Sequence, residues 1–167
     1  MNNKFTTKEM GEWKIKIGNA LMHSDDLMGL LTGKNVSTFT KVQRATEFKK
    51  YVSSHLFIND DALGSVLDFK DSRIFFDISI VSTHPQTKTC SIMIVALCHR
   101  DILDTYDGNE YLGNRADVMA QMIEEALLDE KIVKNFGIGD LSLDSVEPYN
   151  STTMYGRILM FSVPNFR

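Results

Sequence analysis

The sequence predicts an α+β fold, in which one mainly antiparallel four-stranded sheet of two β-hairpins packs against an N-terminal helix and a helix between the hairpins. Three observations support this prediction. Residues 1–55 carry apolar side chains at helical spacing, the spacing changes to alternation at Ser72, and an amphipathic helix separates two pairs of apolar runs. With 167 residues, of which 43% are hydrophobic, the chain suits a single domain spanning residues 1–167.

The N-terminal part, residues 1–55, is expected to be helical. Apolar residues recur every three or four positions over 7–22, which predicts an amphipathic helix. A shorter helix is expected over 25–31, because Gly33 follows it and glycine commonly ends helices. Residues 39–55 also show helical spacing, although β-branched and polar residues interrupt it. Residues 56–71 are expected to form an irregular arm.

Strand-like alternation begins at Ser72, with isoleucine or phenylalanine at every second position. The polar stretch STHPQTKT, residues 82–89, interrupts the run and is expected to be the loop of an antiparallel hairpin. The following run, CSIMIVALCH, is apolar on both faces, as in a central strand. Cys90 and Cys98 lie on one face of it, too far apart for a disulfide, so both are expected to be reduced, buried thiols.

A polar loop with two glycines, residues 105–114, leads to a helix expected over 115–129. Asn114 is a suitable N-cap, and Asp117, three residues later, can return a hydrogen bond to the cap or oppose the helix dipole. After this helix, a turn-rich segment joins the two apolar runs of the second hairpin, GDLSLDSVEP and YGRILMFSVP.

The net charge of −4 is unevenly distributed. Residues 1–55 hold nine Lys or Arg and five acids, whereas residues 56–167 hold nine Lys or Arg and seventeen acids. Chance clustering of solvated side chains is one explanation, and contact between the basic part of one copy and the acidic part of the next is another. For the second explanation, Lys14 and Lys16 are the candidate contacts. Reversing both to Glu is expected to weaken assembly, most strongly at low salt.

The sequence lacks the patterns of a catalytic or metal site. Cys98 and His99 are strand neighbours, so they point to opposite faces and cannot act together as nucleophile and base. Zinc-ligand spacings and glycine-rich nucleotide loops are absent, as are Lys/Arg-rich runs typical of nucleic-acid binding. We therefore expect no catalytic residue, no metal and no cofactor.

Membrane and export signals are also missing from the sequence. No apolar run reaches the roughly 18 residues of a membrane helix, and the polar start MNNKFTTKEM lacks the apolar core of a signal peptide. We expect a soluble protein that is made in the cytoplasm and has no membrane partner.

The C-terminal part carries short motifs in a defined order. A strand ends near a histidine, a loop leads to an R-x-D helix start, a G-I-G-x-L-x-L strand follows, and the last strand reads Y-G-R-x-L-x-F-x-V. In this order, over about residues 72–167, they resemble the tail-terminator and head-tail joining (neck) proteins of tailed bacteriophages. The residues that carry the resemblance are His99, Gly113, Arg115, Asp117, Gly137, Ile138, Gly139, Leu141, Leu143, Tyr155, Gly156, Arg157, Leu159, Phe161 and Val163.

The resemblance implies a non-enzymatic virion subunit, made in the host cytoplasm, that forms a ring in the tail or neck. Such rings, commonly hexamers for terminators and dodecamers for some adaptors, cap the tail tube and join it to the head. We expect a homo-oligomer, a hexamer in the terminator case, that binds the tail tube protein and neck or connector proteins. Double-stranded DNA would pass through its lumen without sequence-specific binding.

Two departures from the simplest family pattern, a longer loop before the helix and a long N-terminal segment, leave the ring position open, so another connector adaptor or tail-associated ring protein is one alternative. A separate alternative belongs to a different class, a small enzyme or nuclease with an acidic site.

Four further residues are candidate subunit or ring contacts. Tyr106 and Tyr111 are rigid, amphipathic side chains of the kind that anchor interfaces, although a mobile surface loop is the alternative. If the two tyrosines contact a partner, replacing both by Ser is expected to leave the fold intact. Arg115 either pairs locally with an acid or a loop carbonyl, or crosses to the next subunit. Arg157 is a charge in mid-strand and is expected to face solvent, DNA or a partner.

Overall fold

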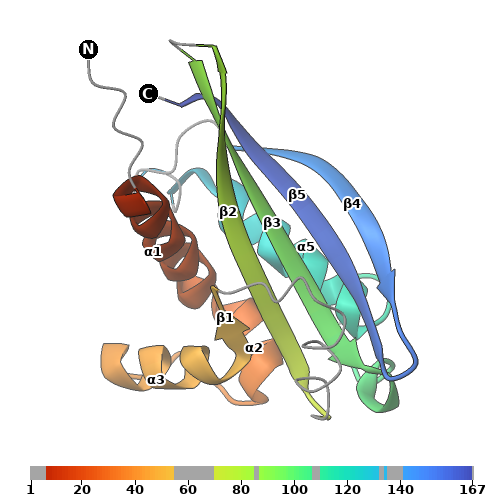
Figure 1. Cartoon of the computed structure of the whole chain (residues 1–167). Helices are drawn as coiled ribbons and strands as arrows, with labels where there is room; N and C mark the ends of the chain where they lie inside the picture. The colour runs from red at the N-terminus through yellow and green to blue at the C-terminus, as the bar shows by residue number, and fades with distance from the viewer. Residues whose placement is uncertain are drawn as a thin grey trace.

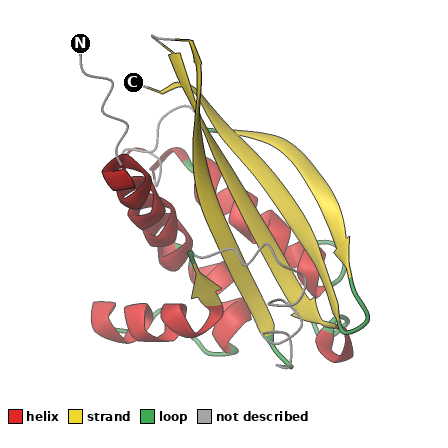
Figure 2. Cartoon of the chain, viewed as in Figure 1, coloured by secondary structure: helices red, strands yellow, loops and turns green. Residues whose placement is uncertain are grey.

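The structure is a computed structural model, and it describes residues 7–54, 70–84, 87–106, 110–131, 134 and 141–166. Within these residues the predicted α+β class is confirmed, with four α-helices and a five-stranded mixed sheet. Figures 1 and 2 show the long strands side by side and the helices α1, α2 and α5 on one face of the sheet.

Two helices begin the described chain, α1 (Thr7–His23) and α2 (Asp25–Thr32). Ser24 separates them and caps α2, because its hydroxyl accepts a hydrogen bond from the Leu27 amide at 3.2 Å. Gly33 ends α2 in the left-handed conformation, with φ of 66°. Both helices therefore lie where the sequence predicts them.

The third helix, α3 (Lys41–Tyr51), lies within the range predicted as helical. It begins with a capping box, in which the Thr40 hydroxyl accepts from the Gln43 amide and the Gln43 side chain accepts from the Thr40 amide. No residue of α3 is buried. The helix leads directly into the two-residue strand β1 (Val52–Ser53).

The remaining strands are β2 (Ser72–His84), β3 (Thr87–His99), β4 (Ser142–Asn150) and β5 (Met154–Phe166), and the sheet order is β1-β2-β3-β5-β4. Strands β2 to β5 pair antiparallel as two hairpins. A 3-10 turn, η1 (Arg100–Ile102), follows β3. The predicted pair of hairpins is present, with β3 and β5 side by side in the centre.

The prediction of four strands was wrong by one strand. Val52 and Ser53 fall within the range predicted as helix, but they pair in parallel with Ile74 and Phe75 of β2. Two residues are too few to show alternation, and their partners lie about twenty positions later, so the sequence carries no local signal for this strand.

The first hairpin is also longer than predicted. Strand β2 continues to His84 and β3 begins at Thr87, within the stretch 82–89 that was predicted as a loop. Threonine favours extended backbone even where the sequence is polar, so polarity alone misplaced the turn. Of the predicted arm, residues 56–69 lie outside the described residues, and Lys70 and Asp71 form a bend before β2.

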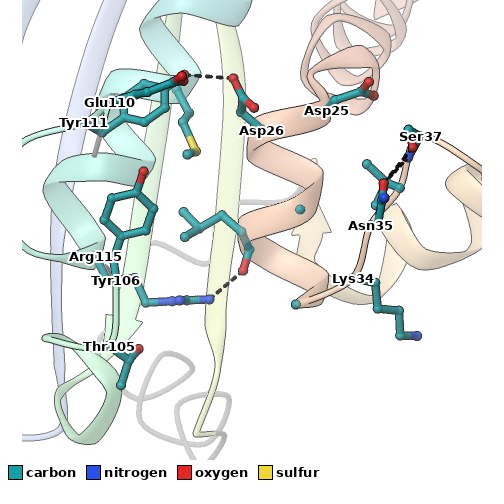
Figure 3. A pocket seen from close by; sticks show the side chains of 15 residues that line it. Asp25, Asp26, Lys34, Asn35, Ser37, Thr105, Tyr106, Glu110, Tyr111 and Arg115 are labelled. Carbon is teal, nitrogen blue, oxygen red and sulfur yellow. Dashed lines mark hydrogen bonds between the residues drawn. The ribbon is translucent and has the colours of Figure 1, made fainter. Parts of the chain in front are cut away.

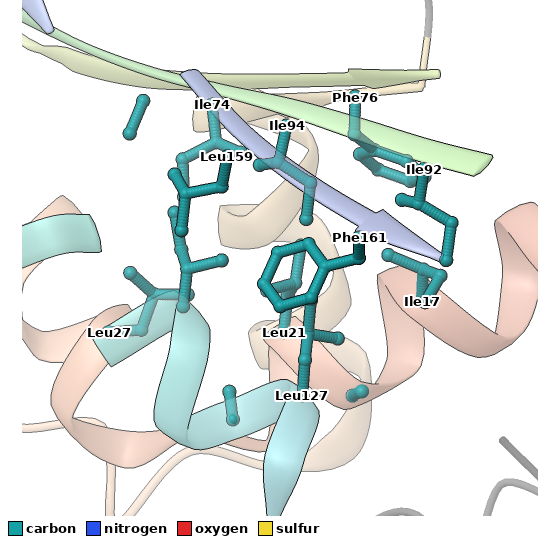
Figure 4. Close-up of a cluster of buried hydrophobic side chains, with 14 of the residues drawn as sticks. Ile17, Leu21, Leu27, Ile74, Phe76, Ile92, Ile94, Leu127, Leu159 and Phe161 are labelled. Carbon is teal, nitrogen blue, oxygen red and sulfur yellow. The ribbon is translucent and has the colours of Figure 1, made fainter. Parts of the chain in front are cut away.

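The core lies between the sheet and the helices. The stripe of α1 that the spacing identifies packs, as predicted, with alternate residues of β2 in one buried cluster. Figure 4 shows Ile17 beside Phe76 and Ile92 of the sheet, with Phe161 of β5 close by. The cluster includes Trp13, Ile17 and Leu21 of α1 and Ile74, Phe76 and Ile78 of β2.

The opposite face of the sheet carries a smaller apolar cluster of Val95, Leu97 and Met154, with Phe75 and Ile158 packed against it. Strand β3 is therefore apolar on both faces, as the sequence predicts for a central strand. The described helices α1, α2 and α5 lie on the other face (Figure 1).

Both cysteines are free and buried, as predicted. Burial raises the pKa of both thiols, that of Cys90 to about 11, which disfavours the reactive thiolate. No helix in the described part of the chain is long and apolar enough to cross a lipid bilayer.

Replacing Ile17 by Asp is expected to unfold the protein or make it insoluble. Ile17 is 0% exposed, and a buried carboxylate without a partner costs several kcal/mol, comparable to the free energy of unfolding of a small domain. The matched control is Ile15→Asp, two residues earlier on α1, where the side chain is 65% exposed. Soluble yield and thermal unfolding of both variants measure this. A folded Ile17→Asp variant would mean that α1 does not complete the core.

Candidate functional site

The start of α5 (Arg115–Leu128) forms the capping box that the sequence predicts. The Asn114 side-chain oxygen accepts hydrogen bonds from the amides of Ala116 and Asp117, at 3.0 and 3.1 Å. In return, the Asp117 carboxylate accepts from the Asn114 amide at 3.3 Å. The carboxylate at this position also opposes the partial positive charge of the helix N-terminus.

The same carboxylate has a second partner in the sheet. Arg157 of β5 donates from Nε to Asp117 Oδ1 at 2.7 Å, and both side chains are about one quarter exposed. The Arg157 guanidinium also lies 5.5 Å from the centre of the Tyr155 ring. The mid-strand arginine that the sequence predicts to face solvent, DNA or a partner is thus paired within its own chain, and an interface role for it stays a prediction.

Two glycines of the motifs lie where a side chain would collide with a neighbouring element. Gly113 has φ of +106°, and a Cβ there would lie 2.8 Å from the Asp117 side chain. At Gly156, a Cβ would lie 2.2 Å from the backbone oxygen of Ala96 on β3. These two glycines come from two motifs far apart in the sequence. Gly113, Asp117 and Arg157 join α5 to the sheet, and Gly156 lets β5 lie close to β3.

Arg115, the first residue of α5, connects three elements. Its Nε donates to the Ser72 hydroxyl at 2.9 Å, and its Nη2 donates to the Leu30 carbonyl oxygen at 2.5 Å. Leu30 belongs to the last turns of α2, whose carbonyls carry partial negative charge, and Ser72 begins β2. The sequence suggested that Arg115 pairs locally with an acid or a loop carbonyl. Its backbone partner is a carbonyl, but this carbonyl belongs to helix α2.

The two tyrosines hold their loop to the domain. Tyr111 Oη lies 3.0 Å from Asp26 Oδ2 of α2 and 2.7 Å from Glu125 Oε2 of α5. Burial, together with hydrogen bonds to the two carboxylates, strongly raises the pKa of the Tyr111 hydroxyl, which therefore keeps its proton. Tyr106 packs edge-on against Tyr111, with ring centres 6.5 Å apart. Both rings contact the main core, so replacing them is expected to destabilise the domain, contrary to the expectation from sequence.

A cleft of about 710 Å³ lies between α2 with its following loop and the segment that precedes α5. Figure 3 shows Tyr111 directed at Asp26 and Arg115 directed at the backbone of α2. Acidic and basic groups both line the cleft, among them Glu110 and Lys34. In the part of the chain that the structure describes, no three His, Cys, Asp or Glu side chains are grouped to hold a metal ion.

The two lysines of α1 lie elsewhere. Lys14 Nζ is 2.7 Å from Asp77 Oδ1 of β2 and donates to the Ser54 carbonyl oxygen at 3.1 Å. Lys16 Nζ lies 5.2 Å from the centre of the Trp13 ring. Lys14 therefore joins α1 to the edge of the sheet. Reversing its charge would disturb the fold as well as any contact between copies.

The structure thus separates the predicted residues into groups. Tyr106, Tyr111 and Arg115 line one cleft. Arg157 belongs to β5 and contacts the first turn of α5, and the two lysines belong to α1. Sequence reasoning did not identify Ser72 or Glu125 as partners. Neither stands in a recognisable motif, and both act through contacts between elements distant in sequence.

A model of the YomW family matches residues 24–163. The chain belongs to the YomW family. The family carries the name of a phage-derived, SPbeta-prophage-like protein, which suggests a phage origin. The YomW match begins at Ser24, the cap of α2, and ends at Val163, so it includes α5, strands β1 to β4 and most of β5 but not α1. No curated protein matches the chain.

Replacing Asp117 by Ala is expected to lower the free energy of unfolding by about 1–3 kcal/mol, because the change removes half of a capping box and leaves Arg157 without its partner. In a double-mutant cycle with Arg157→Ala, we expect a coupling energy of about 1 kcal/mol. Chemical denaturation measures all four proteins, with Glu124→Ala on the same helix as the control. Strict additivity of the two substitutions would show that the ion pair contributes nothing.

Proposed function

We propose that this YomW-family chain is a structural virion protein that forms a ring at the head-tail junction of a tailed phage particle. As a tail terminator or neck protein, it caps the tail tube and joins it to the head, with a channel for DNA. It acts by assembly and carries out no chemical reaction. The phage-type family name supports a phage setting, and the finer assignment rests on the motifs of the C-terminal part.

The observation that carries the proposal is the meeting of these motifs in space. The resemblance rests on short patterns that could each arise by chance. In the structure, however, the R-x-D start and the Y-G-R strand join directly through Asp117 and Arg157, and Gly113 leaves room for the Asp117 side chain. These two motifs therefore belong to one packing unit of α5 and β5, whereas Gly137, Ile138 and Gly139 of the G-I-G-x-L-x-L motif lie outside the described residues.

The architecture is compatible with assembly into a ring. The sheet has two different edges, because β4 lies at one end and the short β1 covers only Ile74 and Phe75 of β2 at the other. A subunit with two different edges can associate head to tail, and such contacts close into a ring when the rotation permits. A net charge of −4 also suits a channel that does not hold DNA, since it repels phosphates.

Loss of the protein from the particle that carries it is expected to give DNA-filled heads without tails and tails of irregular length. Joining and length termination both depend on the ring in this proposal. Electron microscopy of particles made without the gene, with and without the gene supplied in trans, measures this. Normal particles in the absence of the gene would overturn the proposal. Metal-dependent cleavage of DNA by the purified monomer would instead favour the nuclease alternative.

The loop before α5 offers a narrower test. Leu112 is 80% exposed, although the backbone beside it is held by Gln121, so its side chain is available to a partner. We expect Leu112→Ser to change the free energy of unfolding by less than about 0.5 kcal/mol while it lowers the proportion of joined particles. Tyr111→Ser is the comparison variant, because it should reduce stability first. Undiminished joining with Leu112→Ser would leave the loop without a role between subunits or rings.

A further inference from the structure

We propose that copies of this chain associate head to tail through two surfaces at opposite edges of the sheet. One is the exposed face of α3, and the other is the outer edge of β4. The inference rests on the proposed function, because it names the surfaces by which the subunits of the ring would meet.

The two surfaces lie on opposite sides of the domain. Helix α3 leads into β1, the first strand in the sheet order, and contacts β1 and β2, whereas β4 is the last strand. Figure 1 shows α3 and β4 on opposite sides, with β2, β3 and β5 between them. At about 4.8 Å per strand spacing, the two edge strands are roughly 19 Å apart. One copy can therefore use both surfaces at once with different neighbours.

Each surface carries exposed charge that has no partner among the described residues. On α3, Arg44 pairs with Asp25 and Lys50 pairs with Glu47. Lys41 and Lys49 are exposed and form no ion pair or hydrogen bond with another side chain in the described chain.

On β4 both charged residues are acidic. Asp144 accepts hydrogen bonds from the hydroxyls of Ser142 and Ser162. Glu147 is exposed and, among the residues that the structure describes, has neither an ion pair nor a hydrogen bond from a side chain. The unpaired lysines of α3 and the carboxylates of β4 are therefore complementary in sign.

Each of the two elements also exposes one large apolar side chain, and on β4 this side chain projects from the face of the strand opposite to Glu147. Val42 of α3 is 75% exposed, and Val146 of β4 is 45% exposed. Helix α3 has eleven residues and buries none of them, and an isolated helix of that length is marginal in water. Contact with a second copy would bury Val42 and add to the packing that Phe48 and Tyr51 of α3 make against the core.

The edge of β4 is better suited to contact with a helix than to pairing with another strand. Pro148 lies within the strand and has no backbone N–H to donate. The register with β5 also shifts between Leu143 and Ser145, which interrupts the regular edge. Both features are used by edge strands that avoid pairing with other sheets. A partner would therefore meet β4 through side chains, as an exposed helix can.

The test is a charge swap. Lys41→Glu together with Lys49→Glu, or Glu147→Lys alone, is expected to raise the dissociation constant between copies about five- to tenfold and lower the fraction of rings. Combining the three substitutions is expected to restore assembly, because opposite charges meet again. High salt should reduce the difference between wild type and variants. Light scattering and electron microscopy of the full chain measure ring formation, and thermal unfolding checks that each variant is folded.

The control reverses two lysines away from both surfaces, Lys8→Glu with Lys131→Glu, and is expected to assemble normally. If the wild type and every charge variant form rings of equal stability, the inference is overturned and the proposed function still stands. A wild-type chain that stays monomeric, alone and with the tail tube protein, would instead overturn the proposed ring itself.

A second measurement tests the direction of contact. Both native cysteines are buried, so Val42→Cys and Val146→Cys each add one accessible thiol. With a short thiol-reactive crosslinker, a mixture of the two variants should give crosslinked pairs, and each variant alone should not. Pairs formed by the Val42→Cys variant alone would show that α3 meets α3, which contradicts head-to-tail association.

Discussion

The position of α5 on the sheet depends on the Asp117 carboxylate. The chain must leave the first hairpin, form a helix across the sheet and return as the second hairpin, so the start of that helix sets the relation between the hairpins. Asp117 completes the capping box and also binds Arg157 of β5, so one side chain both caps the first turn of α5 and joins that turn to the sheet, against which the buried face of α5 packs. Arg115 extends the same junction to α2 and β2.

These internal contacts change which surfaces are free for assembly. From the sequence, Tyr111 and Arg115 are candidate interface residues, because tyrosine and arginine are enriched at the energetically important positions of interfaces. Within the folded chain they bind carboxylates or a backbone carbonyl of neighbouring helices. Lys14 is likewise paired with Asp77. Side chains that already have partners would form weaker contacts with a second copy. Exposed charges such as Lys49 and Glu147 are therefore the better candidates for contacts between copies.

The parts of the fold that were predictable are those with local signals. The helical spacing of apolar residues predicted α1, and their alternation predicted β2. The spacing of Asn114 and Asp117 correctly indicated the capping box. Strand β1 and the partner of Arg157 were not predictable, because each depends on a contact between distant elements. An acid in the first turn of a helix already has a local explanation as a cap. Only the packed structure shows that a second group uses the same carboxylate.

A ring subunit has to bind its neighbours without adding strands indefinitely. The sheet edge at β4 carries a proline, a register shift and carboxylates, which all oppose strand pairing, yet it still exposes Val146. Contacts between a few surface charges and one apolar side chain are individually weak, often under 1 kcal/mol for an exposed ion pair. In a closed ring every copy makes both contacts, so the last copy to enter forms two interfaces at once. Weak and complementary edges would therefore favour complete rings over single pairs, while β4 remains protected from nonspecific strand addition.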